Sequence, residues 1–303
     1  MLRSSLLYLS NQPRVFRFVR HNRLAKKFAS RFVAGETLDD AISAARATNK
    51  RGISVSLDHL GENVNDAGEA RATAAGYVAA IDRIAAEGVE ANISIKPTAL
   101  GLDIDEALCR ENIAQVLCRA KRHEMFVRVD MEGSPYTQRT LDLVTDLHRE
   151  YDNTGTVLQT CLYRTPRDVE SLIAERIRVR LVKGAYLEPP TIAYPRKVDV
   201  DEQYIRLMGE LLDRGVYPAI ATHDERIIAA TRAHAERHHI PQARFEFQML
   251  YGIRRDLQDR LAHDGYNVRV YIPYGTEWYP YLTRRLAERP ANLMFVVSNT
   301  LRG

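Results

Sequence analysis

The sequence predicts an α/β protein whose eight strands and eight helices alternate and close into one parallel barrel. From residue 52 onward, short β-branched or apolar runs alternate eight times with longer segments of helical periodicity. The 303 residues suit a barrel of this class and contain no linker, internal repeat or low-complexity tract that would divide them. Sequential β–α units of this length place their strands parallel, through right-handed crossovers.

Two helices are expected before the barrel, so we assign residues 1–50 to a helical arm packed on the barrel and residues 51–303 to the barrel itself. Residues 1–35 contain no acidic side chain and interleave apolar residues with eight basic ones, which predicts an amphipathic helix. The basic residues are Arg3, Arg14, Arg17, Arg20, Arg23, Lys26, Lys27 and Arg31. A second helix is predicted from an N-cap at Thr37 to about Asn49.

The barrel elements follow in order. The predicted strands span residues 53–57, 92–95, 126–129, 156–158, 179–182, 218–221, 244–247 and 268–272. The helices that follow them are predicted at about 66–87, 104–121, 136–150, 167–175, 200–214, 224–238, 254–263 and 278–289.

Polar side chains stand at the C-terminal end of every predicted strand, which is where barrels of this kind carry their active sites. In chain order they include Asp58, His59, Lys96, Thr98, Asp130, Glu132, Gln159, Arg180, Lys183, Thr222, His223, Asp224, Glu246, Gln248 and Tyr271. A single polar residue could simply satisfy a partner inside the barrel, but polar residues at all eight ends indicate a functional mouth.

The last predicted helix, residues 278–289, places Tyr281, Arg284, Arg285 and Glu288 on one face. One interpretation is a solvated surface helix with an Arg284–Glu288 ion pair. The other is a carboxylate clamp, in which paired guanidiniums grip an anion and the glutamate fixes one of them. The helix follows the eighth strand directly, so the clamp is favoured if the helix lies over the mouth.

Several chemistries lack their motifs in this chain. It contains no dinucleotide-binding G-x-G turn, G-x-S-x-G elbow, H-E-x-x-H pair or Walker loop. Cys109, Cys118 and Cys161 are odd in number and lack metal-binding spacing, which favours a reducing compartment. His234 and His238 are i, i+4 neighbours, but we interpret them as part of a solvated helix face and expect no metal site.

Enough basic residues remain at the mouth to hold two anionic groups. A substrate carboxylate is expected on Arg284, Arg285 and Lys96. A phosphorylated cofactor is expected near Arg180, Lys183, Gly184, Arg196, Lys197, Thr222 and His223. Gly184 would allow backbone N–H groups to approach an anion closely.

The motifs at these strand ends resemble those of the proline dehydrogenase family. They include R-L-V-K-G-A-Y (180–186), A-T-H-D (221–224), F-E-F-Q-M-L (245–250), V-Y-I-P (270–273) and Y-L-T-R-R-L-A-E (281–288). Earlier matches are L-D-H-L-G-E (57–62), I-K-P-T (95–98) and R-V-D (128–130). The resemblance runs from about residue 32 to the C-terminus. It implies a distorted barrel that binds FAD noncovalently, oxidises L-proline to Δ1-pyrroline-5-carboxylate and passes electrons to a membrane quinone.

The resemblance also implies roles for particular residues. Asp130 and Arg180 would lie nearest the chemistry. Substrate would contact Lys96, Tyr186, Leu250, Tyr271, Tyr281, Arg284 and Arg285, with Glu288 holding an arginine. FAD would contact Met131, Gln159, Arg180, Lys183, Gly184, Ala185, Thr222 and His223, with Arg196 and Lys197 as weaker pyrophosphate candidates. Leu187 stands where many relatives have tryptophan, which puts an aromatic contact to the adenine in doubt.

Two other functions remain open from sequence alone. One is a Schiff-base lyase that uses Lys96 or Lys183 at a barrel mouth. The other is a basic module that binds membrane or nucleic acid through residues 1–35, although this leaves the polar strand ends unexplained. The length leaves no room for a fused aldehyde dehydrogenase, so a separate pyrroline-5-carboxylate dehydrogenase would take the product.

The basic N-terminal segment has three interpretations. It resembles an organelle transit peptide, it could dock on an anionic membrane surface, or it packs on its own domain with a charged outer face. We favour the third, which is compatible with the second. The expected location is therefore the cytoplasm, peripheral on the inner membrane, with the mitochondrion as the alternative; no nucleic-acid partner is expected.

Overall fold

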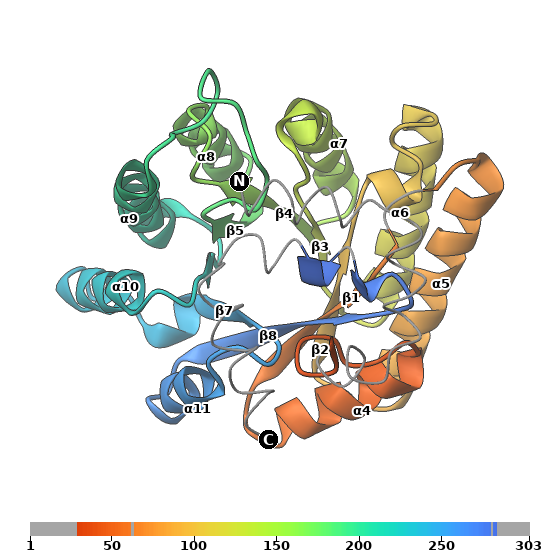
Figure 1. Ribbon diagram of the computed structural model, residues 1–303, viewed down its shortest axis with the longest axis horizontal. Coiled ribbons are helices and arrows are strands. Elements are labelled where there is room, and N and C mark those ends of the chain that lie inside the picture. Colours follow the sequence, from red (N-terminus) through yellow and green to blue (C-terminus); the bar gives the residue numbers. More distant parts are fainter. Residues whose placement is uncertain (1–28, 62–63, 280, 284–303) are drawn as a thin grey trace.

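A computed structural model of the chain describes residues 29–61, 64–279 and 281–283. Eight parallel strands form one closed barrel, in which each strand pairs with the next along the chain and β8 returns to β1. The helices form an outer ring around this barrel (Figure 1). The predicted fold class is confirmed.

The order of elements follows the predicted alternation. The strands are β1 (Ser54–His59), β2 (Ala91–Ile95), β3 (Val127–Val129), β4 (Thr154–Gln159), β5 (Arg178–Val182), β6 (Ala219–Ala221), β7 (Glu246–Leu250) and β8 (Asn267–Tyr274). The helices are α4 (Leu38–Asn49), α5 (Ala67–Ala86), α6 (Glu106–Arg122), α7 (Thr137–Glu150), α8 (Thr165–Ala174), α9 (Lys197–Arg214), α10 (Glu225–Arg237) and α11 (Arg255–His263). Three short 3-10 helices are η1 (Thr98–Leu100), η2 (Ser134–Tyr136) and η3 (Gln242–Arg244).

The strands separate an apolar layer outside the barrel from a polar interior. On β2, Ile93 and Ile95 belong to the main hydrophobic core shared with the helices. Ser94, between them, points the other way and lies 3.1 Å from the Ser56 hydroxyl on β1. Successive residues of a strand face opposite sides, so this alternation leaves the barrel interior to polar and charged side chains.

The last two strands differ from their predicted boundaries. Residues 242–244 form a 3-10 helix after Pro241, so β7 starts and ends later than predicted. Strand β8 continues past its predicted end because its partner β1 extends to His59, which pairs with Tyr274. Tyr271 therefore lies inside β8 and not at its end, as the sequence suggested.

Helix α4 covers the seam between the first and last strands. It starts at the predicted cap: Thr37 Oγ1 accepts a hydrogen bond from Asp40 N (3.2 Å), and Asp40 Oδ2 accepts one from Thr37 N (3.0 Å). Its buried Ala41 and Ala45 pack toward β1 and β8. Helix α4 thus occupies the outer wall where a helix after β8 would otherwise complete the ring.

The chain after β8 turns over the barrel instead. Trp278, Tyr281 and Leu282 form a second cluster with Val33 and Leu60, apart from the main core. Leu60 follows the C-terminal end of β1, so this cluster lies at the mouth. In Figure 1 the dark blue end of the described chain lies within the ring of outer helices, which is the position that the sequence predicted for the final helix.

Candidate active site

A buried ion pair between Lys96 and Asp58 forms one side of the barrel mouth. Asp58 lies near the end of β1 and Lys96 directly follows the neighbouring strand β2. Lys96 Nζ donates to Asp58 Oδ1 over 2.6 Å and lies 4.0 Å from Asp130 Oδ2. Burial raises the pKa of Asp58, and the positive charge of Lys96 offsets this only in part. Asp58 Oδ2 has no hydrogen-bond partner among the described residues.

The guanidinium of Arg180 joins four strands across the mouth. From β5, Nη1 donates to Asp130 Oδ1 over 2.8 Å, and Nη2 donates to Ser94 Oγ over 3.0 Å. The Nε atom donates to Gln248 Oε1 on β7 over 2.5 Å. The side chain is 7% exposed. Three partners fix the plane of the guanidinium, which leaves a pre-oriented positive group at the site.

Tyr271 closes the network from β8. Its hydroxyl donates to Asp130 Oδ2 over 2.9 Å, and the Arg180 guanidinium lies 5.3 Å from the centre of its ring. Burial, followed by the charges of Asp130 and Asp58, raises the pKa of Tyr271 well above its usual range. The phenol is therefore a neutral donor at physiological pH, and Asp130 accepts a hydrogen bond on each oxygen.

The loop after β5, where the sequence places a cofactor, has a glycine at position 184 that packs closely against neighbouring side chains. Gly184 has a φ of +119°, a conformation that L side chains rarely adopt. A Cβ there would lie 2.4 Å from Cys161 Sγ and 3.4 Å from Gln159 Oε1. Gln159 in turn donates through Nε2 to the Glu132 backbone carbonyl over 3.0 Å. Glycine is therefore required at position 184.

The predicted cofactor cations stand beside carboxylates. Lys183 Nζ lies 2.8 Å from Asp224 Oδ2 and 2.6 Å from Asp201 Oδ1. Arg196 and Lys197, at the start of α9, have side chains that are 73% and 72% exposed. They pair with Asp199 and Asp201 respectively. Lys183 thus lies at the strand ends, whereas the other two lie on the outer rim.

Two further cofactor candidates lie at the end of β6. Thr222 N donates to the Gln248 backbone carbonyl over 3.1 Å. Leu250 N donates to His223 Nε2 over 2.9 Å, which requires that nitrogen to be unprotonated. Met131, after β3, is buried, and Ala185 and Tyr186 are partly buried after β5.

The groups after β3 to β6 fit a phosphorylated cofactor. Gln159 offers an amide, Lys183 a cation, and Gly184 a backbone without a side chain of its own, and such groups bind phosphates and the polar edges of heterocycles.

The predicted substrate clamp is described only at its start. Tyr281 is buried in the mouth cluster with Trp278 and Leu60. Arg284, Arg285 and Glu288 lie outside the described residues.

The sequence did not assign roles to three residues that complete this site. Asp58 and Gln248 were visible as polar strand ends, and Asp58 stands on the strand beside Lys96, which is the signal that could have paired them. Ser94 gave no signal, because a serine inside a strand is common. The structure also ties the predicted strand ends Thr98 and Glu132 together, with Thr98 Oγ1 donating to Glu132 Oε1 over 2.6 Å.

The fold and this buried charge network define a (βα)₈-barrel enzyme with its site at the C-terminal ends of the strands. A family model described as proline dehydrogenase matches residues 41–298. The chain belongs to the proline dehydrogenase family. Its members oxidise proline in proline catabolism, so the chain is an oxidoreductase that acts on proline.

Known relatives span nearly the whole chain. Proline dehydrogenase 2 of Bacillus subtilis is 44% identical over 279 residues, which are 90% of this chain and 92% of the relative. Proline dehydrogenase of Deinococcus radiodurans is 42% identical over 308 residues, covering 100% and 99% of the two chains. A solved structure of proline utilization A from Bdellovibrio bacteriovorus, inactivated by N-propargylglycine, aligns with a TM-score of 0.81 at 27% identity. That match covers 86% of this chain and 32% of the solved one.

Proposed function

We propose that the chain oxidises L-proline to Δ1-pyrroline-5-carboxylate with noncovalently bound FAD, and that the electrons pass to a membrane quinone. The observation that carries the proposal is the network in which Arg180 and Tyr271 both donate to Asp130 beside the Lys96–Asp58 pair. It sets fixed donors and buried carboxylates around one point at the barrel mouth.

Each residue of the network has a task in this reaction. The Lys96 ammonium, together with Arg284 and Arg285 of the predicted clamp, binds the proline carboxylate. Asp130 holds the Arg180 guanidinium and the Tyr271 hydroxyl in place, and these orient the pyrrolidine ring against its hydride acceptor. The substrate ammonium must lose a proton before hydride departs, and the carboxylates of Asp58 and Asp130 are the nearest described acceptors to Lys96.

FAD, when bound, supplies the two-electron acceptor for the substrate C–H bond. The groups that would hold it are Gln159, Lys183, Gly184, Thr222 and His223, with Met131 and Ala185 beside them. Arg180 would place a positive charge near the ring, which favours an electron-rich reduced flavin. Arg196 and Lys197 would reach the pyrophosphate only by leaving the aspartates with which they pair.

The decisive experiment is anaerobic addition of L-proline to the purified yellow protein. We expect the flavin absorbance to bleach and a reactive cyclic imine to form in equal amount. A colourless protein that turns over proline would contradict the cofactor assignment, and bleaching without the imine would contradict the product.

The lyase alternative has weaker support. Formation of a Schiff base needs a free amine, whereas Lys96 donates to Asp58 and Lys183 lies against two aspartates. Borohydride should therefore fail to trap a covalent adduct between either lysine and a carbonyl substrate.

The membrane proposal rests on the acid-free, basic segment 1–35. Within the described part of the chain, no helix combines the length and apolarity that a membrane span requires. We infer contact with the cytoplasmic side of the inner membrane through anionic lipid, where a quinone is accessible. Binding to anionic vesicles should weaken as salt rises, because exposed charges are screened over about 8–10 Å. Equal binding to neutral vesicles would contradict it.

The product needs a second enzyme. Relatives named bifunctional protein PutA, such as that of Escherichia coli, are 30% identical over a region that is 23% of their length. The proposed partner here is a pyrroline-5-carboxylate dehydrogenase. A pull-down with that enzyme that recovers no complex would leave free diffusion of the product as the route between the two enzymes.

A further inference from the structure

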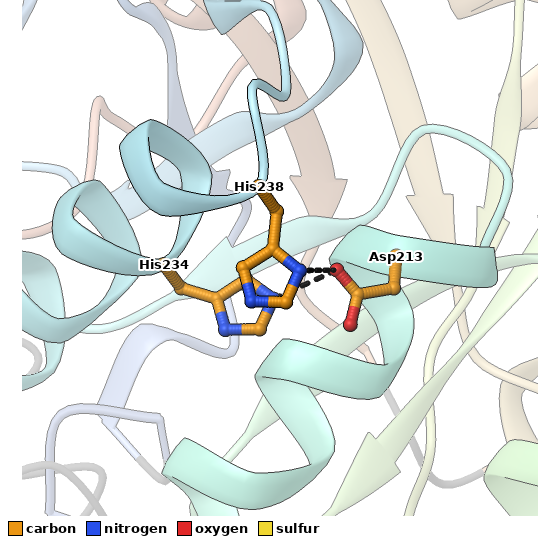
Figure 2. A group of neighbouring side chains, drawn as sticks. All are labelled: Asp213, His234 and His238. Carbon is orange, nitrogen blue, oxygen red and sulfur yellow. Dashed lines mark hydrogen bonds and ion pairs between the residues drawn. The ribbon is translucent and has the colours of Figure 1, made fainter.

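Three metal-ligating side chains meet on the outer ring of helices, outside the site described above. Asp213 lies in the last turn of α9, His234 in the last turn of α10, and His238 caps α10. His234 Nε2 lies 2.8 Å from Asp213 Oδ1, and His238 Nδ1 lies 3.3 Å from the same oxygen. Figure 2 shows both imidazoles directed at this one carboxylate. The sequence revealed only the histidine pair, because Asp213 comes from another helix.

The neighbouring helix is shaped to admit this cluster. Gly209 is one helical turn before Asp213 on α9, and a Cβ at that glycine would lie 3.0 Å from His234 Cε1. The absence of a side chain at position 209 lets the His234 ring sit against α9 with 20% of its side chain exposed. Asp213 and His238 are more exposed, at 36% and 43%, so one side of the cluster faces solvent.

The spacing matches that of atoms bound to one ion. Imidazole nitrogens and carboxylate oxygens bind Zn²⁺ at about 2.0–2.2 Å, which places neighbouring tetrahedral ligands on the order of 3.3 Å apart. The His238 contact to Asp213 Oδ1, at 3.3 Å, has this spacing, the His234 contact is shorter at 2.8 Å, and one ligand atom from each of the three residues lies within 4.8 Å of the others. The two helix ends also favour binding of a cation, because the C-terminal ends of α9 and α10 both carry partial negative charge.

The two imidazole rings must move slightly to share an ion. They are now stacked, with centroids 4.1 Å apart and planes inclined by 10°. The lone pair of each nitrogen lies in the plane of its ring, so coordination of one ion opens the stack.

A second pair of helices carries the same arrangement with different chemistry. On α5 and α6, Asp82 receives Arg119 Nε at 2.5 Å and His123 Nε2 at 3.2 Å. Arg119 and His123 are also i, i+4 neighbours, and His123 caps α6 as His238 caps α10. A guanidinium has no lone pair to donate, so the α5–α6 cluster is an ion-pair network and cannot coordinate a metal.

From this comparison we propose that Asp213 Oδ1, His234 Nε2 and His238 Nδ1 bind one divalent transition-metal ion, with Zn²⁺ as the best match, and leave a fourth position to water. Two imidazoles and a carboxylate are a ligand set typical of Zn²⁺. The helices run opposite to the strands, so their C-terminal ends lie at the face away from the catalytic mouth. The ion therefore links α9 to α10 and stabilises the folded chain without taking part in catalysis.

The test uses full-length, untagged protein, freed of metal by chelation and dialysis and then titrated with Zn²⁺. We expect one equivalent to bind and the melting temperature to rise by roughly 5 °C at a hundredfold excess over the dissociation constant. Cobalt(II) should give the strong visible absorption of a tetrahedral site. Absence of Zn²⁺ uptake would overturn the proposal.

Matched variants locate the ion. His238→Ala, at an exposed position, should weaken Zn²⁺ binding by at least about tenfold and abolish the thermal shift. His123→Ala removes a histidine from the equivalent helix cap and should leave both unchanged. Zn²⁺ binding by His238→Ala as tight as in the parent protein would overturn the assignment, and so would a loss of binding in His123→Ala.

A gain-of-function variant tests whether the geometry is sufficient. Arg119→His, combined with Val78→Gly to give α5 the room that Gly209 gives α9, should convert the α5–α6 cluster into a second site and raise the stoichiometry to two. A variant that still bound only one Zn²⁺ per chain would overturn the argument that an aspartate on one helix and two histidines four residues apart on the next are sufficient for a site.

Discussion

Two carboxylates buried inside the same barrel, Asp58 and Glu246, each face a cation, yet their pKa values shift in opposite directions. Arg269 Nε lies 3.0 and 3.1 Å from the two oxygens of Glu246, and Gln248 donates to one of them. Burial opposes the shift, but the charge and hydrogen bonds of Arg269 hold the pKa of Glu246 below its usual value. Burial prevails at Asp58, where only one oxygen is bonded, and raises its pKa.

The opposite pKa shifts distinguish a carboxylate that stabilises the barrel, Glu246, from one that belongs to the candidate active site, Asp58. Glu246 stands at the start of β7, toward the bottom of the barrel, and its partner Arg269 also donates to the Val55 carbonyl over 2.9 Å. Both oxygens of Glu246 accept hydrogen bonds, and the Tyr217 hydroxyl adds a further contact to Oε2 over 3.4 Å. Asp58 stands at the mouth, next to Lys96, with an oxygen to spare. A buried carboxylate whose two oxygens both accept hydrogen bonds stabilises the fold. One that keeps an oxygen without a partner can exchange a proton more readily.

The largest expected effect comes from breaking the saturated pair. Glu246→Gln leaves Arg269 buried without its counter-charge and should lower the free energy of unfolding by about 3–5 kcal/mol, measured by urea denaturation. The matched control is Glu170→Gln, which removes an exposed carboxylate that Arg214 also contacts through two nitrogens, at 2.8 and 2.9 Å. We expect no measurable change there. Equal losses in the two variants would show that burial does not distinguish the pairs.

The next effect concerns activity at the mouth. Arg180→Lys keeps the charge but loses the fork that reaches Asp130, Ser94 and Gln248 together, and should lower kcat/KM for proline by about 10- to 100-fold. Arg178→Lys changes the same strand one layer deeper, where the guanidinium stacks on Phe126. That variant should keep kcat/KM. A fall of similar size in both would mean that the strand, and not the network, sets the rate.

A smaller effect is expected in substrate choice. Tyr271 lies in the mouth beside Arg180 and Asp130, where its ring would meet one edge of a bound pyrrolidine. Tyr271→Ser should narrow the preference for L-proline over trans-4-hydroxy-L-proline by about tenfold, since it relieves a clash and offers a partner for the added hydroxyl. Tyr271→Phe keeps the ring and should keep the preference. An unchanged ratio of kcat/KM values in Tyr271→Ser would remove Tyr271 from the pocket wall.

The smallest expected effect is the sign of the change in stability with pH, which should differ between the two carboxylates. The lowered pKa of Glu246 adds stability above its unfolded-state pKa, and this is lost as pH falls through the folded-state value. The raised pKa of Asp58 adds stability below its unfolded-state pKa, and this is lost as pH rises through the folded-state value. Relative to Asp58→Asn, the parent should lose stability as the pH rises; relative to Glu246→Gln, it should lose stability as the pH falls. If the stability difference between parent and variant changed with pH in the same direction for both residues, the opposite pKa shifts of Asp58 and Glu246 would be contradicted.

The sequence predicted most of the fold because each β–α unit carries its own periodicity and punctuation. The cap at Thr37 and the eight alternations are local signals, and they were sufficient for the barrel. Contacts between strands are not local. The pairing of Glu246 with Arg269 depends on the register of β7 against β8, and the start of β7 was misplaced because residues 242–244 lack a clear turn signal.

The candidate site was predicted in its residue types more than in its contacts. Asp130, Arg180 and Tyr271 were assigned to the mouth, but Tyr271 was placed at a strand end and its hydrogen bond to Asp130 was not foreseen. The meeting of Asp213 with His234 and His238 was missed for the same reason, since Asp213 and His234 come from separate helices. Residues that meet only through tertiary structure have no characteristic spacing in the sequence from which their contact could be predicted.

The position of α4 also constrains how the chain is made. Its apolar residues pack against β8, and Ala34 N and Gly35 O hydrogen-bond to Pro273 O and Gly275 N, at the opposite end of the chain. During synthesis α4 leaves the ribosome before any strand of the barrel, and its apolar face stays uncovered until β8 is released. The barrel therefore closes only after β8 has been synthesised, and the intervening β–α units must form or wait before that closure.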